Sequence, residues 1–177
     1  MLEHKFCNTG GEIAVTDGTT ISGYASLFGA PDQGGDVVER GAYAASLAKG
    51  RGIKMLWQHD PAQPIGVWEE VREDDRGLWV KGRLLTDVTK GREAASLIAA
   101  RAIDGLSIGY RTLKARKDEA GLRRLTELEL WEVSLVTFPM LPQARVGAKA
   151  DDPEDRAMEI LAEAFETARA CLIPAKI

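Results

Sequence analysis

The sequence LELWEVSLV, residues 128–136, places Leu128, Leu130 and Glu132 at alternate positions. In a β-strand such positions share one face, so the pattern predicts a carboxylate that points into the protein with the two leucines. A buried carboxylate costs several kcal/mol or must protonate unless it has a partner. A histidine N–H is a suitable partner. The alternatives are a bulge that turns Glu132 outward, or pairing of Glu132 with an arginine such as Arg111.

A second strand pattern, GLSIGY at residues 105–110, carries a candidate nucleophile. Alternation puts its three larger side chains on one face and places Ser107 and Gly109 on the other, with Arg111. A glycine inside a strand weakens it, and indicates that another backbone or a ligand approaches closely. Ser107 therefore has open space beside its hydroxyl. The alternative is an ordinary surface serine in an edge strand.

Histidine is scarce, which narrows the candidates for a general base. The chain has two histidines, and His4 lies close to the N-terminus. His59, in WQHDP at residues 57–61, follows a short apolar run and precedes a proline turn. It is thus the one imidazole placed for chemistry near neutral pH, unless it only caps that turn. A zinc site with several histidines is excluded, and there is no CxxC pair to replace it.

Together, Ser107, His59 and Glu132 meet the requirements of nucleophilic acyl transfer. A serine hydroxyl needs a neighbouring base to take its proton, and a third group orients that base. Competing sites are weaker. Cys7 could serve as a nucleophile but lies near the terminus, and the turn aspartates that could bind a metal are Asp32, Asp36 and Asp60. No phosphate-binding glycine loop is present, and we expect no cofactor and no metal.

Composition limits the partners. The 177 residues have a formal net charge of −4 and a pI of about 5.3, which gives no indication of nucleic-acid binding. No apolar run is long enough to span a membrane, and no secretory signal is recognisable. We expect the two cysteines, Cys7 and Cys171, to be reduced thiols, and the cytoplasm to be the compartment.

The order of segments indicates an α+β protein that is mainly β up to residue 140. We expect strands at residues 20–28, 53–57, 65–71, 77–85, 105–113 and 122–138. A helix is expected at residues 41–47, and an amphipathic one at 87–102 with a capping candidate at its start. Residues 114–121, within a basic stretch, are predicted to form a charged, solvated hairpin tip. We predict a core domain over residues 1–150 and a C-terminal amphipathic helix and tail over 151–177.

With these residues in hand, the chain resembles the tailed-phage prohead protease family, which shares a fold with the herpesvirus maturation proteases. The matching stretches cover much of residues 20–146: GDVV at 35–38, GAY at 41–43, LWQHD at 56–60, GLSIGY at 105–110 and LWEVSLVTFP at 130–139. The order histidine, serine, strand is more specific than any one of these motifs. Herpesvirus enzymes of this fold use a serine with two histidines. Here the corresponding strand carries Glu132, so a carboxylate must take the third role.

This resemblance implies a small closed or nearly closed, mainly antiparallel β-barrel surrounded by helices. It also implies a serine endopeptidase that cleaves the scaffolding segment of the major capsid protein, and itself, inside the immature procapsid in the bacterial host. Such enzymes are often homodimers, and residues 151–177 could form a dimer or scaffold contact or pack on their own domain. The oxyanion donors are not identifiable, although residues 140–145 correspond to the expected region. Two other functions stay open: a catalytically silent capsid-assembly module that binds scaffold, and a small-molecule esterase.

Overall fold

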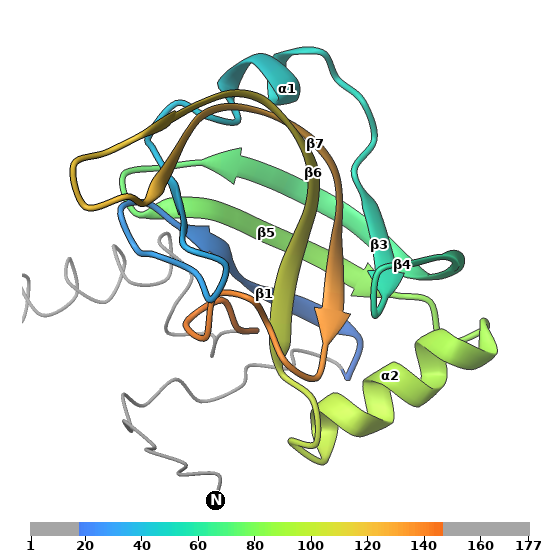
Figure 1. Ribbon diagram of the computed structural model, residues 1–177. Helices are drawn as coiled ribbons and strands as arrows, with labels where there is room; N and C mark the ends of the chain where they lie inside the picture. Colours follow the sequence, from blue (N-terminus) through green and yellow to red (C-terminus); the bar gives the residue numbers. More distant parts are fainter. Residues whose placement is uncertain (1–17, 147–177) are drawn as a thin grey trace, which may run out of the picture.

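The computed structural model describes residues 18–146 (Figure 1), and this part of the chain holds seven strands and two helices. The elements in chain order are β1 (Thr20–Leu27), β2 (Asp36–Val38), α1 (Ala44–Ala48), β3 (Lys54–Trp57), β4 (Asp60–Glu73), β5 (Gly77–Leu84), α2 (Thr89–Ala99), β6 (Gly105–Lys117) and β7 (Arg123–Val136). The C-terminal helix that we expected, both cysteines and His4 lie outside the described residues.

All seven strands belong to one sheet, in which β7 pairs with three other strands: β2, β3 and β6. The strand order is β1-β5-β4-β3-β7-β2, and β6 pairs with β7 in addition. The pairs β1–β5, β5–β4, β4–β3 and β6–β7 are antiparallel, whereas β2 and β3 both run parallel to β7. β7 therefore joins strands from distant parts of the sequence, and the mainly antiparallel character that we expected is confirmed.

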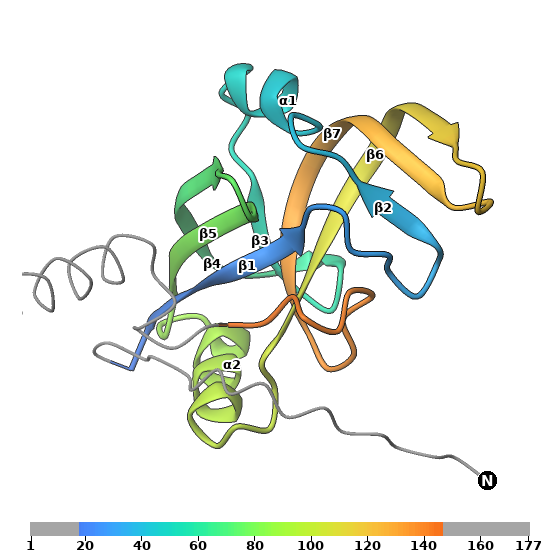
Figure 2. The same ribbon diagram turned by 90° about the vertical axis from the view of Figure 1, so that its left-hand side faces the viewer.

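The sheet is strongly curled. Figures 1 and 2 show the β6–β7 hairpin arching over β1 and β5, with α1 at one end of the molecule and α2 at the other. Side chains from the concave face fill the core, including Ile21, Leu78, Leu106 and Leu130, each at most 1% exposed. This arrangement buries apolar side chains from both arms of a single sheet, so few helices are needed to cover it.

Closure into a barrel and a ring of helices, as the sequence predicted, are not confirmed. The segment after β7 bridges the gap between β6 and β1 only through isolated pairings, Gly105 with Arg145 and Gly23 with Val146. In residues 18–146 the helices stand at two ends of the sheet rather than around it (Figure 2). No helix in that range is long and apolar enough to span a membrane.

The β6–β7 hairpin extends further than its charged sequence suggested. Residues 114–117, expected in a turn, continue β6 and pair with the start of β7. Ion pairs line this outer part of the hairpin: Lys114 with Glu127, Arg116 with Glu39, and Arg124 with Asp118. Lys114 and Glu127 face each other across the two strands, and opposite-charge pairs of this kind contribute modestly to the stability of a two-stranded ribbon. The turn itself is confined to residues 118–122.

Both helices occupy the predicted positions. α1 ends before Gly50, whose φ of +63° is the left-handed geometry that a glycine stop supplies. α2 buries Ala94 and Ile98, as its periodicity predicted, and also Gly91. Its start differs from the expectation. Val88 is the N-cap and no side chain caps the helix, so Asp87 does not serve as a capping residue.

Candidate active site

A bulge in β7 decides where Glu132 points. Gly109 pairs with Glu132, but the next residue of β6, Tyr110, pairs with Leu130, so Trp131 is an extra residue in β7. The bulge moves Glu132 off the core face that Leu130 occupies and onto the opposite face. The expectation that Glu132 shares a face with Leu128 and Leu130 is therefore wrong, because one inserted residue reverses the alternation. Trp131 itself is 49% exposed.

Glu132 is nevertheless only 9% exposed, because Gly109 makes room for it. A Cβ atom on Gly109 would lie 2.6 Å from the carboxyl carbon of Glu132, which is impossibly close. The glycine that we took as a sign of close approach is thus explained by a side chain of the neighbouring strand. The carboxylate lies over Gly109 of β6, on the same face as Ser107.

His59 is held over this face by a strained turn. Trp57 and Asp60 are strand partners, so Gln58 and His59 form a two-residue hairpin loop. Their φ angles are +52° and +62°, the pattern of a type I′ turn, in which Asn and Gly are the usual residues. Each non-glycine residue in this region costs on the order of 1 kcal/mol or more, and such strain is typical of functional positions.

Hydrogen bonds from β7 and the segment after it hold the turn in place. The Gln58 N–H donates to the Leu135 carbonyl at 2.9 Å, and the Gln58 side-chain amide donates to Thr137 Oγ1 at 2.8 Å. The His59 N–H donates to Ser134 Oγ at 3.1 Å. These contacts fix the backbone of the turn relative to the strand that carries Glu132.

The imidazole meets the carboxylate directly. His59 Nδ1 lies 2.6 Å from Glu132 Oε1, and the Ser134 hydroxyl donates to the other oxygen, Oε2, at 2.5 Å. The Ser134 hydroxyl thus connects the carboxylate to the backbone of His59 through two hydrogen bonds. Ser134 is fully buried. A carboxylate that accepts from Nδ1–H leaves Nε2 as the free lone pair, which is the tautomer that a general base requires.

The pairing with Glu132 also raises the pKa of the His59 imidazole. The hydrogen bond to Glu132 and the negative charge of that carboxylate raise the pKa of His59 above its usual 6.5, against the opposing effect of partial burial. His59 therefore accepts a proton more readily than a free histidine does. This is the property expected of a base that must take a proton from a hydroxyl.

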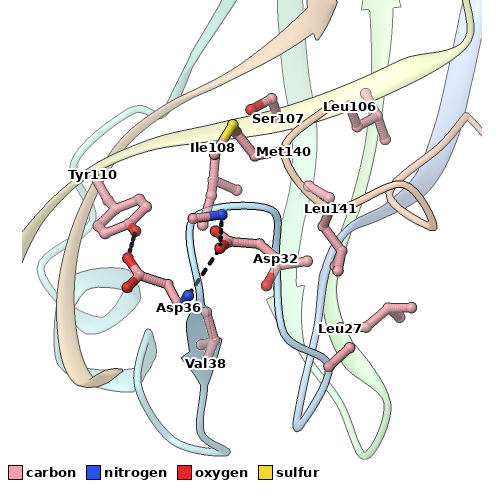
Figure 3. Close-up of a pocket in the computed structure, with 14 residues that line it drawn as sticks. Leu27, Asp32, Asp36, Val38, Leu106, Ser107, Ile108, Tyr110, Met140 and Leu141 are labelled. Carbon is pink, nitrogen blue, oxygen red and sulfur yellow. Dashed lines mark hydrogen bonds between the residues drawn. The ribbon is translucent and has the colours of Figure 1, made fainter. Parts of the chain in front are cut away.

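Ser107 lies on the same face as this network. It is 6% exposed and pairs across the ladder with Ser134, whose hydroxyl binds both His59 and Glu132. The alternation predicted for β6 is confirmed. Figure 3 shows the Ser107 side chain on one side of the β6 ribbon, and those of Ile108 and Tyr110 on the other. All three residues that the sequence singled out, Ser107, His59 and Glu132, thus gather around Ser134.

The alternative partners are engaged elsewhere. Arg111 pairs with Glu129 at 2.9 Å rather than with Glu132. Asp60 accepts from the Ala62 N–H and from Gln63, so it stabilises its own turn. In residues 18–146 no three His, Cys, Asp or Glu side chains gather as a metal site would require. Cys7 lies outside this range.

In residues 140–145, the region expected to supply oxyanion donors, the arginine side chain is already engaged in other contacts. The Arg145 guanidinium forms an ion pair with Asp104 and donates to the Pro142 carbonyl at 2.9 Å. The backbone N–H of Leu106, beside Ser107, donates to the Ala144 carbonyl at 2.8 Å. These contacts tie the loop after β7 to the start of β6.

Sequence reasoning missed three residues of the network: Ser134, Gln58 and Thr137. Ser134 had a usable signal, because a residue two positions after Glu132 in a strand shares its face. Gln58 and Thr137 had none. Their contact is made possible by the parallel pairing of β3 with β7, which brings residues far apart in the chain together.

The chain is similar to known phage proteins. The family model of the Caudovirus prohead serine protease matches residues 10–159. The prohead protease of Enterobacteria phage HK97 is 30% identical over 132 residues, which cover 72% of this chain and 59% of that protein. A capsid polyprotein of Pseudomonas phage PAJU2 is 33% identical over 146 residues, 77% of this chain and 21% of that protein. The chain thus matches less than two thirds of either relative.

Solved structures show the same fold at low sequence identity. The bacteriophage T4 capsid assembly protease aligns with a TM-score of 0.58 at 14% identity, covering 68% of this chain and 82% of that one. The KSHV protease, solved with a hexapeptide phosphonate inhibitor, aligns with a TM-score of 0.52 at 12% identity, covering 83% and 76%. The matched family model spans most of the sequence, including every residue of the network above. The chain belongs to the Caudovirus prohead serine protease family.

Proposed function

We propose that this protein is a serine endopeptidase in which Ser107 is the nucleophile, His59 the general base and Glu132 the residue that orients His59. The observation that carries the proposal is the contact of 2.6 Å between His59 Nδ1 and Glu132 Oε1, on the face that also bears Ser107. A serine, an imidazole and an orienting carboxylate are the parts that acyl transfer needs.

The reaction then proceeds in two halves. His59 Nε2 takes the proton of the Ser107 hydroxyl as Oγ attacks the scissile carbonyl carbon, and the same proton passes to the leaving amine as the C–N bond breaks. A water molecule next gives a proton to Nε2 as its oxygen attacks the acyl carbon. The ester bond to Oγ then breaks and Nε2 returns the proton to Oγ, which releases the new carboxyl end and restores Ser107. Glu132 stays ionised and stabilises the imidazolium that forms in each half.

The substrate that we propose is the scaffolding segment of the major capsid protein, together with the protease itself, inside the immature procapsid in the host cytoplasm. Family membership and the similarity to a capsid polyprotein support this choice. We further propose that residues 1–150 form the protease domain, that residues 151–177 form an appended helix, and that the sheet works as a nearly closed barrel. We also propose that two copies of this chain form a homodimer.

Co-expression with the capsid protein of the same genome tests the proposal. The unchanged protein should shorten the capsid protein at defined sites, and Ser107→Ala should leave it at full length. Normal cleavage by Ser107→Ala would refute the assignment. If neither protein cleaves but both enter procapsids, the function is that of a silent assembly module instead. Hydrolysis of small esters without any cleavage of the capsid protein would favour an esterase.

A further inference from the structure

A pocket opens on the other side of β6 from the Ser107 hydroxyl. It encloses about 150 Å³ between β1 with the loop that follows it, β6, and the loop after β7 (Figure 3). Its walls are mainly apolar and include Leu27, Val38, Ile108 and Leu141. Ser107 itself is among the lining residues, so the pocket reaches the position of β6 that carries the proposed nucleophile on its other face.

Two carboxylates are the charged groups that line this pocket, and no lysine, arginine or histidine lines it. Its other polar side chains are those of Ser26, Ser107 and Tyr110. The negative charge of Asp36 is balanced by Arg123, which does not line the pocket and lies 2.6 Å from the carboxylate. Asp36 also accepts a hydrogen bond from the Tyr110 hydroxyl at 3.0 Å. Asp32 uses one oxygen, Oδ1, to accept the backbone N–H groups of Gly34 and Asp36 at 2.8 and 2.9 Å. These neutral donors fix the Asp32 carboxylate in place and leave its negative charge in the pocket.

The phenol of Tyr110 responds to this negative charge. Burial, the hydrogen bond to Asp36 and the charges of both Asp36 and Asp32 raise the pKa of Tyr110 to about 12, against a smaller opposing effect of Arg123. Burial, the largest cause, disfavours a charge of either sign, whereas the charges of Asp36 and Asp32 disfavour a second anion in particular. These two carboxylates favour a cation for the same electrostatic reason.

The location relative to Ser107 connects the pocket to a substrate. A peptide that lies extended along a strand presents successive side chains to opposite faces. β6 pairs with β7 along one edge, and an extended peptide could lie along its other edge. The scissile carbonyl of such a peptide would meet the Ser107 hydroxyl on one face of the sheet, while an adjacent side chain points to the opposite face, where this pocket lies. Met140 borders the pocket and is 47% exposed, so the entrance is open to solvent.

We infer that this pocket receives a lysine or arginine side chain that flanks the scissile bond, with Asp32 as the residue that selects it. The inference rests on the proposed function. Lysine and arginine combine an apolar stem with a charged head, which matches apolar walls around a fixed carboxylate. An aliphatic side chain would leave that carboxylate desolvated without a partner, and an acidic one would be repelled.

Cleavage-site profiling tests this inference. Peptides made from an unfolded bacterial proteome by cutting after glutamate are incubated with the protein, and new ends are sequenced by mass spectrometry. Sites that Ser107→Ala does not produce are attributed to the enzyme. We expect enrichment of lysine and arginine at one position close to the cleaved bond. Asp32→Asn should lower that enrichment about fivefold while cleavage continues, because Asn can accept the same two backbone N–H groups without the charge.

Asp118 provides a matched control. Its Oδ1 accepts the backbone N–H groups two and four residues later, from Ala120 and Leu122, as Asp32 Oδ1 does, but it lies outside the pocket. Asp118→Asn should leave the preference unchanged. Met140→Lys, which places a cation at the entrance, should weaken the preference even if Asp32→Asn folds poorly.

The failures of the two proposals are distinguishable. Cleavage that depends on Ser107 but shows no basic preference, or a preference that survives both Asp32→Asn and Met140→Lys, overturns the role of the pocket alone. Absence of any cleavage that depends on Ser107 overturns the proposed function and the inference with it.

Discussion

The two ends of the β6–β7 hairpin both pair carboxylates with basic side chains, yet the pairs differ in kind. At the outer end, Glu127 meets Lys114 with side chains 27% and 73% exposed. At the inner end, Glu132 meets His59, and Glu132 is 11% exposed in its side chain. The outer pair is a solvated contact of small net value. The inner pair lies beside a bulge, a strained turn and a glycine that makes room for it, which indicates a site maintained for function rather than stability.

Loss of the imidazole is expected to give the largest effect in this comparison. His59→Ala removes the proposed base and should lower kcat for capsid-protein cleavage by about 10² to 10⁴. Lys114→Ala, which removes the basic partner at the outer end, should change the rate less than about twofold. The rates can be compared by gel-based cleavage assays with both variants checked for folding by circular dichroism. Similar losses for the two variants would remove the distinction between the ends.

Replacing each carboxylate by its amide sharpens the comparison. Glu132→Gln should lower kcat/KM by about 10², less than Ser107→Ala does, whereas Glu127→Gln should have no measurable effect. Because Glu132 raises the pKa of His59, its loss should also move the acidic limb of the pH–rate profile toward lower pH. An unchanged rate and profile for Glu132→Gln would assign the third role to another group or to water.

The space that Gly109 leaves for Glu132 can be tested with one methyl group. Gly109→Ala should displace the carboxylate from His59, lower kcat by about tenfold or more, and shift the pH profile in the same direction as Glu132→Gln. Gly52→Ala is the matched control, because its nearest neighbour is the flexible end of Lys54 at 4.0 Å. If Gly109→Ala keeps full activity, the tight contact has no functional role.

Ser134 should act as a positioning residue with a smaller effect. Ser134→Ala removes the hydroxyl that binds Glu132 and the His59 N–H, so we expect a loss of about tenfold in kcat with little change in KM. Ser46→Ala separates this from a general loss of stability. Ser46 is also a buried serine that accepts a backbone N–H, but its partner is Leu130 rather than His59. Both variants should lower the melting temperature, and only Ser134→Ala should lower kcat.

The smallest expected effect is on stability as a function of pH. The pKa of His59 is raised in the folded protein, so the His59–Glu132 pair contributes stability that is fully present below the unfolded value of about 6.5 and is lost as pH rises through the folded value. The melting temperature of the unchanged protein should therefore exceed that of Glu132→Gln by more at pH 5.5 than at pH 8.5. A difference that grows with pH would contradict the direction of the shift.

The residues that gather at the site could be predicted from their types, while the geometry that brings them together could not. Ser107, His59 and Glu132 were identifiable because imidazole was scarce, because Gly109 followed the serine, and because a carboxylate stood in an apolar strand. The bulge at Trp131 was not identifiable, since alternation read from the sequence assumes an unbroken ladder. Glu132 contacts His59 on the face of β7 opposite to the one that we expected.

For the fold too, local elements could be predicted from the sequence, whereas long-range pairings could not. Most strands and both helices lie within a few residues of their predicted bounds, but β4 begins at Asp60 rather than at residue 65 and β6 continues to Lys117 rather than to residue 113. β2, with three residues, is too short to give a pattern. The parallel pairing of β3 with β7 joins segments about 80 residues apart, and the sequence carries no local signal for such a pairing. That pairing places the His59 turn over the Glu132 strand. Barrel closure likewise depends on long-range contacts that the alternation pattern does not encode.

Labelling with a fluorophosphonate, followed by mass spectrometry of tryptic peptides, tests the central claim most directly. The peptide of residues 102–111 contains Ser107 as its one serine, so an adduct there can be assigned to that hydroxyl by fragmentation. We predict that Ser107 carries the label in the unchanged protein and that His59→Ala reduces labelling by about 10² or more. A label on a different residue, or equal labelling of Ser107 without His59, would contradict the account.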